Sequence, residues 1–362
     1  MDTHLNGILR ILKMYEDSNL KSINFKDGYR KFACSVIIAT KDRALALKDS
    51  ALPSIVNQSF KNFESIIWDA SSNDETRKVV EEFVENFPNF ALKYFKAPRR
   101  GLASQRNDAV KYAKGEIILF IDDDVWLEEK FLENLIKVYK EDKEKEIGGA
   151  EGLIFSPKTN NDGLLSKFSR IFLNIYSLIF LLPREASRNK VLLSGRYTSY
   201  PVTPYQKNEN SDLITGKVDK DLQWLSGCCM SYRREIFDQY NLEFDERFER
   251  FGGYAYMEDG DFSYRVYKDL GLKLVRVRTA RCVHYHTPGG RGDLRLNYAS
   301  RVFNHFLFWE KNIDFSLASL LAFLWSQFGF LIQTVARCIL SRSLSPLKGV
   351  IIAYKTIIKD GL

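Results

Sequence analysis

Short apolar runs alternate with amphipathic segments along the first third of the chain. The apolar runs have the length of strands buried on both faces of a sheet, and they lie at residues 32–40, 63–69, 91–95 and 117–121. The helical patterns between them end near residue 58, or cover residues 74–87 and 103–113. Strand and helix alternating at this spacing predict an open, mostly parallel α/β sheet.

Polar residues stand where three of these runs end. Thr40 ends the first run, Asp69 ends the second, and residues 117–121 lead straight into Asp122, Asp123 and Asp124. Ligands of such sheets bind beyond the carboxyl ends of the strands, so we expect these side chains to meet at one edge. Adjacent carboxylates repel one another and stay ionised only beside water, hydrogen-bond donors or a metal ion. The pattern therefore predicts a cation site.

The same patterning divides the chain into an N-terminal region, a main domain with an insertion, and a C-terminal region. We expect a helical lead-in over residues 1–32, with its helix at about 5–15, a main domain over 33–290 and a helical region over 291–362. Residues 156–220 have the composition of an insertion within the main domain. Its aromatic and aliphatic stretch fits a packed helix and a contact with acceptor or membrane equally well.

The C-terminal region contains an apolar segment. Residues 315–332 carry no charge and are at the lower length limit for a membrane-spanning helix. Five basic residues follow it against one acid, Asp360, and they are Arg337, Arg342, Lys348, Lys355 and Lys359. Because a single crossing would place this basic tail on the far side, we expect a re-entrant or in-plane association on anionic lipid. A helix packed on the main domain is the alternative.

Charge and cysteine content narrow the classes of protein. Lys and Arg total 53 against 46 Asp and Glu, a net charge of +7 that suits anionic phosphates or a membrane surface and does not indicate nucleic acid. The five cysteines include no CxxC pair, which argues against zinc or a disulfide framework and favours a reducing compartment. The first thirty residues lack the basic start and continuous apolar stretch of a signal peptide. We therefore expect the cytoplasmic face of a membrane.

Several separated stretches resemble family 2 glycosyltransferases, in the order in which that family has them. They are SVIIATKDR (35–43), IIWDASSNDET (66–76), RRGLASQRNDAVKYAKGEIILFIDDDVWLEEKFLENL (99–135), LSGCCMSYRREIF (225–237) with FDERF (244–248), and MEDGDFSYRV (257–266). Ordered matches are specific where a single one is not. The resemblance covers about residues 33–287. It implies the GT-A fold, a Rossmann-like open mixed sheet flanked by helices.

The resemblance also implies a donor site. Its nucleotide-sugar-binding residues would be Thr40, Asp69, Arg106, Asn107, Asp122 and Asp123. Asp69 would accept the ring N–H of a uracil-type base, with a turn-capping role as the alternative. Arg106 and Asn107 would approach the sugar or diphosphate, although a solvated helix face explains Arg106 equally well. Asp122 would contact the ribose or sugar, and Asp124 would hold Mn²⁺ or Mg²⁺.

The same resemblance assigns the acceptor side. Asp259 would be the catalytic base that takes the proton of the acceptor hydroxyl, supported by Glu258. Trp224, Gly227 and Asp261 would contact the acceptor. A helix-capping role is the alternative for one of these acids, but not for all three.

A late histidine and a glycine-rich loop complete the expected site. Family members often carry such a histidine on the metal, and imidazole suits Mn²⁺. We expect His284 and His286 to point to opposite faces of a strand, which leaves one ligand, His284 or else His286. The loop at residues 288–292 could close over the donor phosphates with Arg291 or Arg295, or be an ordinary turn.

These features predict an inverting, metal-dependent glycosyltransferase. Its donor would be a nucleotide-diphosphate sugar, UDP-linked, and its acceptor a lipid-linked saccharide or a polysaccharide. A metal-dependent nucleotidyltransferase or phosphotransferase is a first alternative, but the chain has no GxxxxGK[ST] loop. A non-catalytic membrane scaffold that binds nucleotide sugars is the second.

Overall fold

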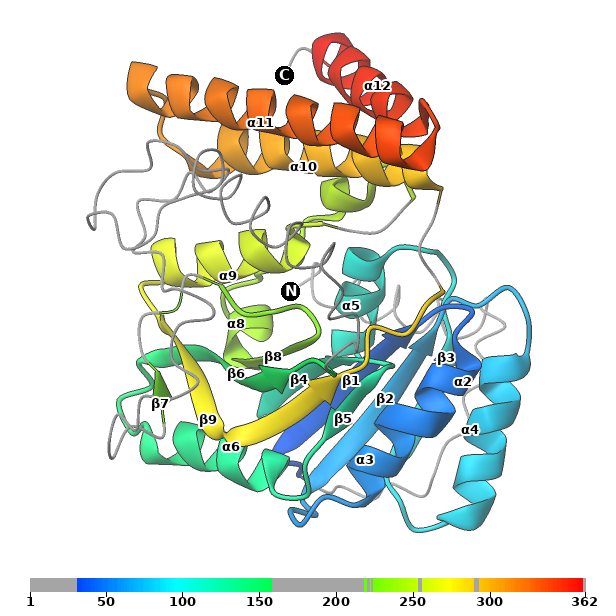
Figure 1. Ribbon diagram of the computed structural model, residues 1–362. Coiled ribbons are helices and arrows are strands. Elements are labelled where there is room, and N and C mark those ends of the chain that lie inside the picture. Colours follow the sequence, from blue (N-terminus) through cyan, green and yellow to red (C-terminus); the bar gives the residue numbers. More distant parts are fainter. Residues whose placement is uncertain are drawn as a thin grey trace, which may run out of the picture.

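The computed structural model describes residues 31–157, 218–219, 222, 224–252, 256–289 and 293–360. The expected helix at 5–15, nearly all of the insertion at 156–220, and Arg291 lie outside these residues. The described residues form a curled sheet with helices on both faces and a further layer of helices at one end (Figure 1).

One half of the sheet is parallel. It contains β1 (Cys34–Thr40), β2 (Phe63–Asp69), β3 (Leu92–Lys96) and β4 (Ile117–Asp122), in the spatial order β3-β2-β1-β4. Successive residues of β1 point to opposite sides, since Val36 and Ile38 join one apolar cluster and Ile37 joins another. Apolar clusters on both faces explain why these strands are continuous apolar runs. The four expected strands are confirmed to within two residues.

The other half of the sheet is mixed. Antiparallel β8 (Cys229–Arg233) pairs with β4, and β6 (Ile147–Phe155), β9 (Lys273–His284) and β5 (Val125–Leu127) follow in that order. The short β7 (Val218–Asp219) pairs with β9. The register of β9 against β6 shifts after Gly152, and β9 continues to pair with β5 beside the end of β4 (Figure 1). A late strand thus reaches the edge where the parallel strands end.

Helices cover both faces of this sheet. One face carries α2 (Ala44–Ala46), the π-helix η1 (Leu47–Ala51), α3 (Leu52–Val56), α4 (Glu75–Asn86) and α6 (Phe131–Glu141). The other face carries α5 (Leu102–Val110), α8 (Glu235–Asp238) and α9 (Glu258–Lys268), and the 3₁₀-helix η3 (Glu246–Glu249) lies near α5 and α10. The fold is the GT-A type of α/β fold that the sequence predicts.

Three C-terminal helices form a layer beyond α9: α10 (Leu294–Asn312), α11 (Leu317–Ser341) and α12 (Ser345–Lys359) (Figure 1). Their shared apolar cluster includes Phe303, Phe308, Trp309, Phe323 and Val350. Among the described residues, α11 is the one helix long and apolar enough to cross a membrane, judged by length and composition alone, with a mean hydropathy of 1.4 over Ser319–Ser341.

The two sides of α11 differ in burial. One side packs inward and includes Phe323, Ser326, Phe330 and Thr334, all under 9% exposed. The opposite side, here called the outer face of α11, is apolar and 42 to 71% exposed, and it comprises Leu317, Leu321, Leu324, Phe328, Leu331, Val335 and Ile339. The inner side of α11 agrees with the alternative of a packed helix, and the in-plane association on lipid stays a prediction to which the outer face could contribute.

Candidate active site

Strand register brings the polar strand ends together. Thr40 lies opposite Asp69 on one side, and Ala39 lies opposite Asp122 on the other. The Thr40 hydroxyl donates a hydrogen bond of 2.6 Å to Asp123 Oδ2. The predicted meeting of these residues at one sheet edge is confirmed.

A cavity of about 540 Å³ opens at this edge. Asp122, Asp123 and Asp124 line it on the sheet side, and Glu258 and Asp259 line it from α9. The rest of the cavity wall includes Arg106, Trp224, Gly227, Tyr264, His305 and Phe308. The two acidic groups predicted from separate parts of the sequence therefore share one cavity.

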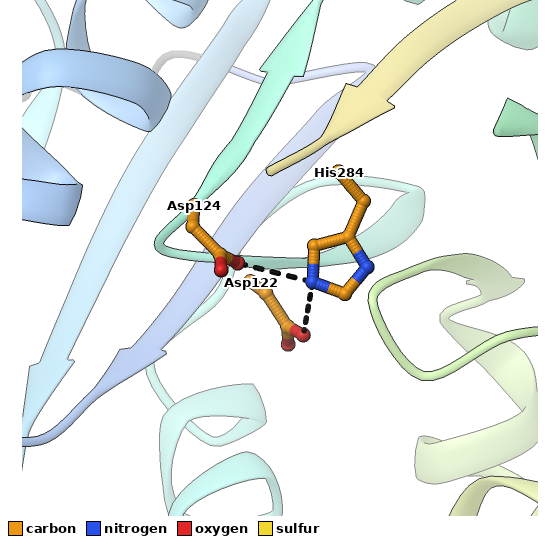
Figure 2. A group of neighbouring side chains, drawn as sticks. All are labelled: Asp122, Asp124 and His284. Atoms are coloured by element: carbon orange, nitrogen blue, oxygen red, sulfur yellow. Dashed lines mark ion pairs between the residues drawn. The ribbon is translucent and has the colours of Figure 1, made fainter. Parts of the chain in front are cut away.

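His284 completes a group of three possible metal ligands with Asp122 and Asp124 (Figure 2). Its Nε2 lies 3.2 Å from Asp124 Oδ1 and 3.8 Å from Asp122 Oδ2, and one ligand atom from each residue falls within 4.8 Å of the others. His284 arrives there because it is the last residue of β9, opposite Val125 of β5. Two carboxylates and an imidazole suit Mn²⁺.

The surroundings of this group fit a cation. Asp124 is 1% exposed, and its two oxygens pair with positive or polar groups, Oδ1 with His284 Nε2 at 3.2 Å and Oδ2 with Arg43 Nη2 at 2.5 Å. A carboxylate buried to this degree is costly unless a cation pairs with it. The sequence assigned Asp122 to the sugar or ribose, whereas the structure also places it among the possible metal ligands.

The expected orientation of the two histidines is wrong. The rings of His284 and His286 lie 3.9 Å apart, on the same side of the chain. Residues two apart on a strand share a face, and His286 follows the strand end with a left-handed φ of 53°. His286 Nε2 lies 2.9 Å from the Ser156 hydroxyl, so His284 is the histidine that faces the carboxylates.

Arg43 is a site residue that the sequence analysis missed. Its Nε lies 3.0 Å from Asp123 Oδ1 and its Nη2 lies 2.5 Å from Asp124 Oδ2. Burial raises the pKa of Asp123 to about 7, against the charge of Arg43 and the hydrogen bond from Thr40. A basic residue in the loop after the first strand was the available signal, since that loop borders the predicted cation site.

Burial has a different outcome at Asp124. Burial alone would raise the pKa of this carboxyl, but the interaction with His284 and the charge of Arg43 outweigh it and hold the pKa below its ordinary value. Burial lowers the pKa of His284, but the two aspartates outweigh burial there and raise it. The imidazole and the guanidinium thus keep this carboxylate ionised.

Asp259 lies on the cavity wall at the start of α9. Its Oδ2 accepts a hydrogen bond of 2.8 Å from the Gly227 N–H. The helix begins directly after Met257, whose left-handed φ of 72° turns the chain into it. A Cβ at position 227 would lie 3.0 Å from Asp259 Oδ2 and 3.2 Å from Arg106 Nη2, so any other residue here would require these two side chains to shift by a few tenths of an ångström.

Arg106 of α5 connects to α9 and to the loop that carries Gly227. Its Nη1 donates to Glu258 Oε1 at 3.0 Å and its Nη2 donates to the Gly227 carbonyl at 2.9 Å. Arg106 is 2% exposed, so the alternative of a solvated helix face is wrong. Burial raises the pKa of Glu258 to about 7, the neighbouring charge of Asp259 adds to this, and Arg106 opposes it.

Glu151 of β6 holds the loop that carries Trp224 and Gly227. Glu151 is fully buried and accepts a hydrogen bond of 2.7 Å from the Ser226 N–H. Arg276 of β9 forms an ion pair of 2.7 Å with the same carboxylate. Glu151 and Arg276 were not predicted, because their pairing depends on the β6–β9 register.

Asp69 and Asn107 do not belong to the cavity lining in the described residues. Asp69 is fully buried and accepts hydrogen bonds from Tyr94 Oη at 2.8 Å and Lys96 Nζ at 3.2 Å. The Asn107 side chain bonds both the N–H and the carbonyl of Phe244. Their assigned ligand contacts stay predictions, and in this structure both side chains serve the protein itself.

Asp261 also points away from the cavity. It is fully buried and accepts hydrogen bonds from Lys311 Nζ at 2.9 Å and Asn312 Nδ2 at 2.8 Å, both at the end of α10. It thereby fastens α9 to the C-terminal layer. Of the glycine-rich loop, Gly289 lines the cavity, while Arg295 forms an ion pair with Asp293.

The curled mixed sheet with acids at the carboxyl ends of its parallel strands defines the GT-A class of α/β proteins. The model of Glycosyl transferase family 2 matches residues 35–240, and the chain belongs to this family.

Two curated relatives and one solved structure illustrate the similarity. The chain is 31% identical over 159 residues to GalNAc(5)-diNAcBac-PP-undecaprenol beta-1,3-glucosyltransferase of Campylobacter jejuni, covering 39% of this chain and 50% of the relative. It is 29% identical over 144 residues to UDP-Glc:alpha-D-GlcNAc-diphosphoundecaprenol beta-1,3-glucosyltransferase WfgD of Escherichia coli, covering 40% of this chain and 49% of the relative. The matches thus span about half the length of these relatives.

The fold resembles that of mannosyltransferase PcManGT from Pyrobaculum calidifontis, solved in complex with GDP-Man and Mn²⁺. The TM-score is 0.51 at 16% identity, and the match covers 98% of this chain and 89% of the other. This likeness supports the fold.

Proposed function

We propose that the protein transfers a sugar from a nucleotide-diphosphate sugar, UDP-linked, to a lipid-linked saccharide or polysaccharide acceptor with inversion at the anomeric carbon. The observation that carries this proposal is one cavity with the Asp122, Asp124 and His284 group on its sheet side and Asp259 on its helix side. Membership of the family supports it, and so does the UDP-Glc donor in the name of the Escherichia coli relative.

In the proposed reaction, Asp259 is the catalytic base. The acceptor hydroxyl oxygen attacks the anomeric carbon from the side opposite the diphosphate, and the Asp259 carboxylate takes the hydroxyl proton. The bond between the anomeric carbon and the diphosphate oxygen breaks, and its electron pair leaves with the nucleoside diphosphate. The Gly227 N–H holds Asp259 Oδ2 in place, and Glu258 supports it through Arg106.

The donor end would use the acids of the strand ends. Asp124 and His284 would hold Mn²⁺ or Mg²⁺, with Asp122 within reach of the same ion. A bound divalent cation would neutralise the diphosphate as it leaves. Thr40, Asp123 and Arg106 line the cavity beside it and would bind the donor.

The C-terminal region, residues 291–362, would attach the main domain, residues 33–290, to the cytoplasmic face of a membrane. The outer face of α11 is apolar, while the inner face packs on the other helices, which fits a helix lying in the plane of the surface. Five basic residues follow residue 332 against Asp360. The undecaprenol-linked substrates in the names of both relatives support a membrane acceptor.

Release of nucleoside diphosphate tests the proposed reaction. Native protein, Asp124→Ala and Asp259→Asn would be supplied with UDP-, GDP- and dTDP-sugars, Mn²⁺ and a membrane lipid extract. We expect turnover of one donor by the native chain and none above background in either variant. Absence of metal-dependent turnover and of donor binding in the native chain would contradict the proposal and favour a scaffold.

Flotation with vesicles tests the membrane contact. We expect native protein to float with phosphatidylglycerol vesicles more than with phosphatidylcholine vesicles, and Phe328→Glu on the outer face of α11 to remain in solution. Leu45→Glu is the matched control, because Leu45 is an apolar residue of α2 that is 72% exposed. Equal flotation of the two variants would contradict this part of the proposal.

A further inference from the structure

Arg301 of α10 is a cation that has no anion among the described residues. Its guanidinium lies over the rings of Tyr256, Tyr298 and Phe330, with Cζ 5.5 to 5.9 Å from the ring centres. Within the described part of the chain it forms no ion pair and no side-chain hydrogen bond, and its Nε is buried without a partner.

Four arginines of the described residues, with side chains at most 14% exposed, each pair with a carboxylate. These pairs are Arg106 with Glu258, Arg233 with Asp142, Arg265 with Asp261, and Arg276 with Glu151. A partly buried charge without a partner is costly, and aromatic faces offset only part of that cost. The exception at Arg301 therefore indicates a site for an anion from outside the protein. A guanidinium presents a planar fork of donors that matches phosphate oxygens.

The position of Arg301 relates it to the acceptor end of the cavity. Arg301, His305 and Phe308 follow the spacing i, i+4, i+7 and so share one side of α10. His305, Phe308 and Tyr256 line the cavity. Arg301 thus lies one helical turn beyond the lining, a rise of about 5.4 Å along the axis.

Within the C-terminal layer, Arg301 of α10 faces α11. Phe330, one of its three rings, belongs to the buried side of α11, and His305 lies 3.4 Å from Gln327 of the same helix. The outer face of α11 is on the opposite side of that helix. The guanidinium therefore lies between the residues that line the cavity and the buried side of α11.

We infer that Arg301 binds the phosphate groups of an acceptor whose saccharide is joined to its lipid through a diphosphate. The saccharide would extend into the cavity toward Asp259, and the lipid would extend along the C-terminal layer. Arg301 is then a positioning residue that selects the class of acceptor and takes no part in bond breaking. This inference rests on the proposed function and specifies its acceptor.

Binding of short prenyl compounds tests the inference without turnover. The probes are farnesyl diphosphate, farnesyl monophosphate and farnesol in detergent micelles, followed by tryptophan fluorescence. The full chain carries Asp124→Ala in EDTA, so that the metal end cannot take the diphosphate. We expect affinity to fall in the order diphosphate, monophosphate, alcohol, and Arg301→Gln to weaken diphosphate binding about tenfold or more while leaving farnesol unchanged.

Two further variants and two further probes make the test specific. Arg342→Gln is the matched control, because Arg342 is an exposed arginine that ends α11 and has no carboxylate partner among the described residues. Arg301→Lys keeps the charge without the fork, and weaker binding than native is expected. Inorganic diphosphate and phosphatidylglycerol separate a free anion or a bulk lipid headgroup from a prenyl diphosphate, and we expect both to bind more weakly.

The outcomes separate this inference from the proposed function. Unchanged farnesyl diphosphate affinity in Arg301→Gln with native circular dichroism, or in Arg301→Lys if the first variant does not fold, overturns the inference even where donor turnover is normal. Equal losses in Arg301→Gln and Arg342→Gln, or preference for phosphatidylglycerol, also overturn it. Failure of the proposed function would instead appear as a native chain with no donor turnover, whatever the prenyl compounds do.

Discussion

Two acidic clusters in this molecule look alike in sequence and differ in space. Asp122, Asp123 and Asp124 follow a strand, and all three line the cavity. Glu258 and Asp259 start a helix with Asp261 close behind, and only the first two line it. Asp261 lies about 200° around the helix axis from Asp259, and its side chain is fully buried.

The clusters also differ in how their charge is balanced. At the strand ends, Arg43 and His284 contact the acids directly and also line the cavity. A ligand in the cavity can therefore compete with them for the carboxylates. On α9, Glu258 pairs with Arg106, which is buried in the cavity wall, and Asp261 pairs with Lys311 away from the cavity. Neighbouring acids therefore indicate one shared site after a strand, but separate roles at the start of a helix.

The largest expected effect comes from Asp259→Asn, which removes the proposed base of the second cluster and keeps its shape. We expect kcat to fall by about 10²- to 10⁴-fold, the usual contribution of a general base. Single-turnover transfer assays would measure it, and calorimetry should show unchanged donor binding. A variant that transfers sugar at the native rate would remove Asp259 from the mechanism.

Asp261→Ala should affect stability more than chemistry. It leaves Arg265 without its carboxylate and Asn312 without its acceptor, while Lys311 keeps Asp245, and we expect the free energy of unfolding to fall by about 3 kcal/mol. Urea denaturation would measure this. Asp360→Ala, which breaks an exposed pair with Arg250, is the control and should cost less than about 1 kcal/mol. Similar losses of unfolding free energy in the two variants would contradict the claim that the buried pairs of Asp261 stabilise the protein more than an exposed pair does.

Arg43→Gln should strengthen cation binding by the first cluster. Removing one positive charge a few ångströms from the ion should raise Mn²⁺ affinity about tenfold with water-like screening. Electron paramagnetic resonance of free Mn²⁺ would measure it without turnover. Lys48→Gln removes an exposed cation paired with Glu82 and serves as the control. Weaker Mn²⁺ binding in Arg43→Gln would show that Arg43 organises the carboxylates and does not compete for them.

A pH dependence of stability is expected at Glu258. Its pKa of about 7 in the folded chain lies above the ordinary value of 4.5, so the folded state binds the proton more tightly. Stability from this group is present at low pH and is lost as pH rises from about 4.5 to 7, by at most about 1.4 kcal/mol per pH unit. Glu258→Gln should flatten this slope in urea denaturation at several pH values. An unchanged slope would contradict the assigned pKa.

The parallel half of the fold could be predicted because its information is local. A run buried on both faces and the polar residue that ends it, such as Thr40 or Asp122, are adjacent in sequence. The rest depends on pairing between distant segments. The reach of β9 to β5, which delivers His284, and the docking of α10, which turns Asp261 inward, are set by tertiary packing. Arg43 was missed for the same reason, since its partners lie eighty residues along the chain.

Both polar groups of Gly227 are engaged, its N–H by Asp259 and its carbonyl by Arg106. If Arg106 shifts when a donor binds, the Gly227 carbonyl moves with it, and the hydrogen bond from the Gly227 N–H to Asp259 changes as well. We expect the two substrates to be thermodynamically linked, so that each raises the affinity for the other by the same factor. The enzyme would then favour an ordered sequence in which a filled donor pocket prepares the base before the acceptor arrives.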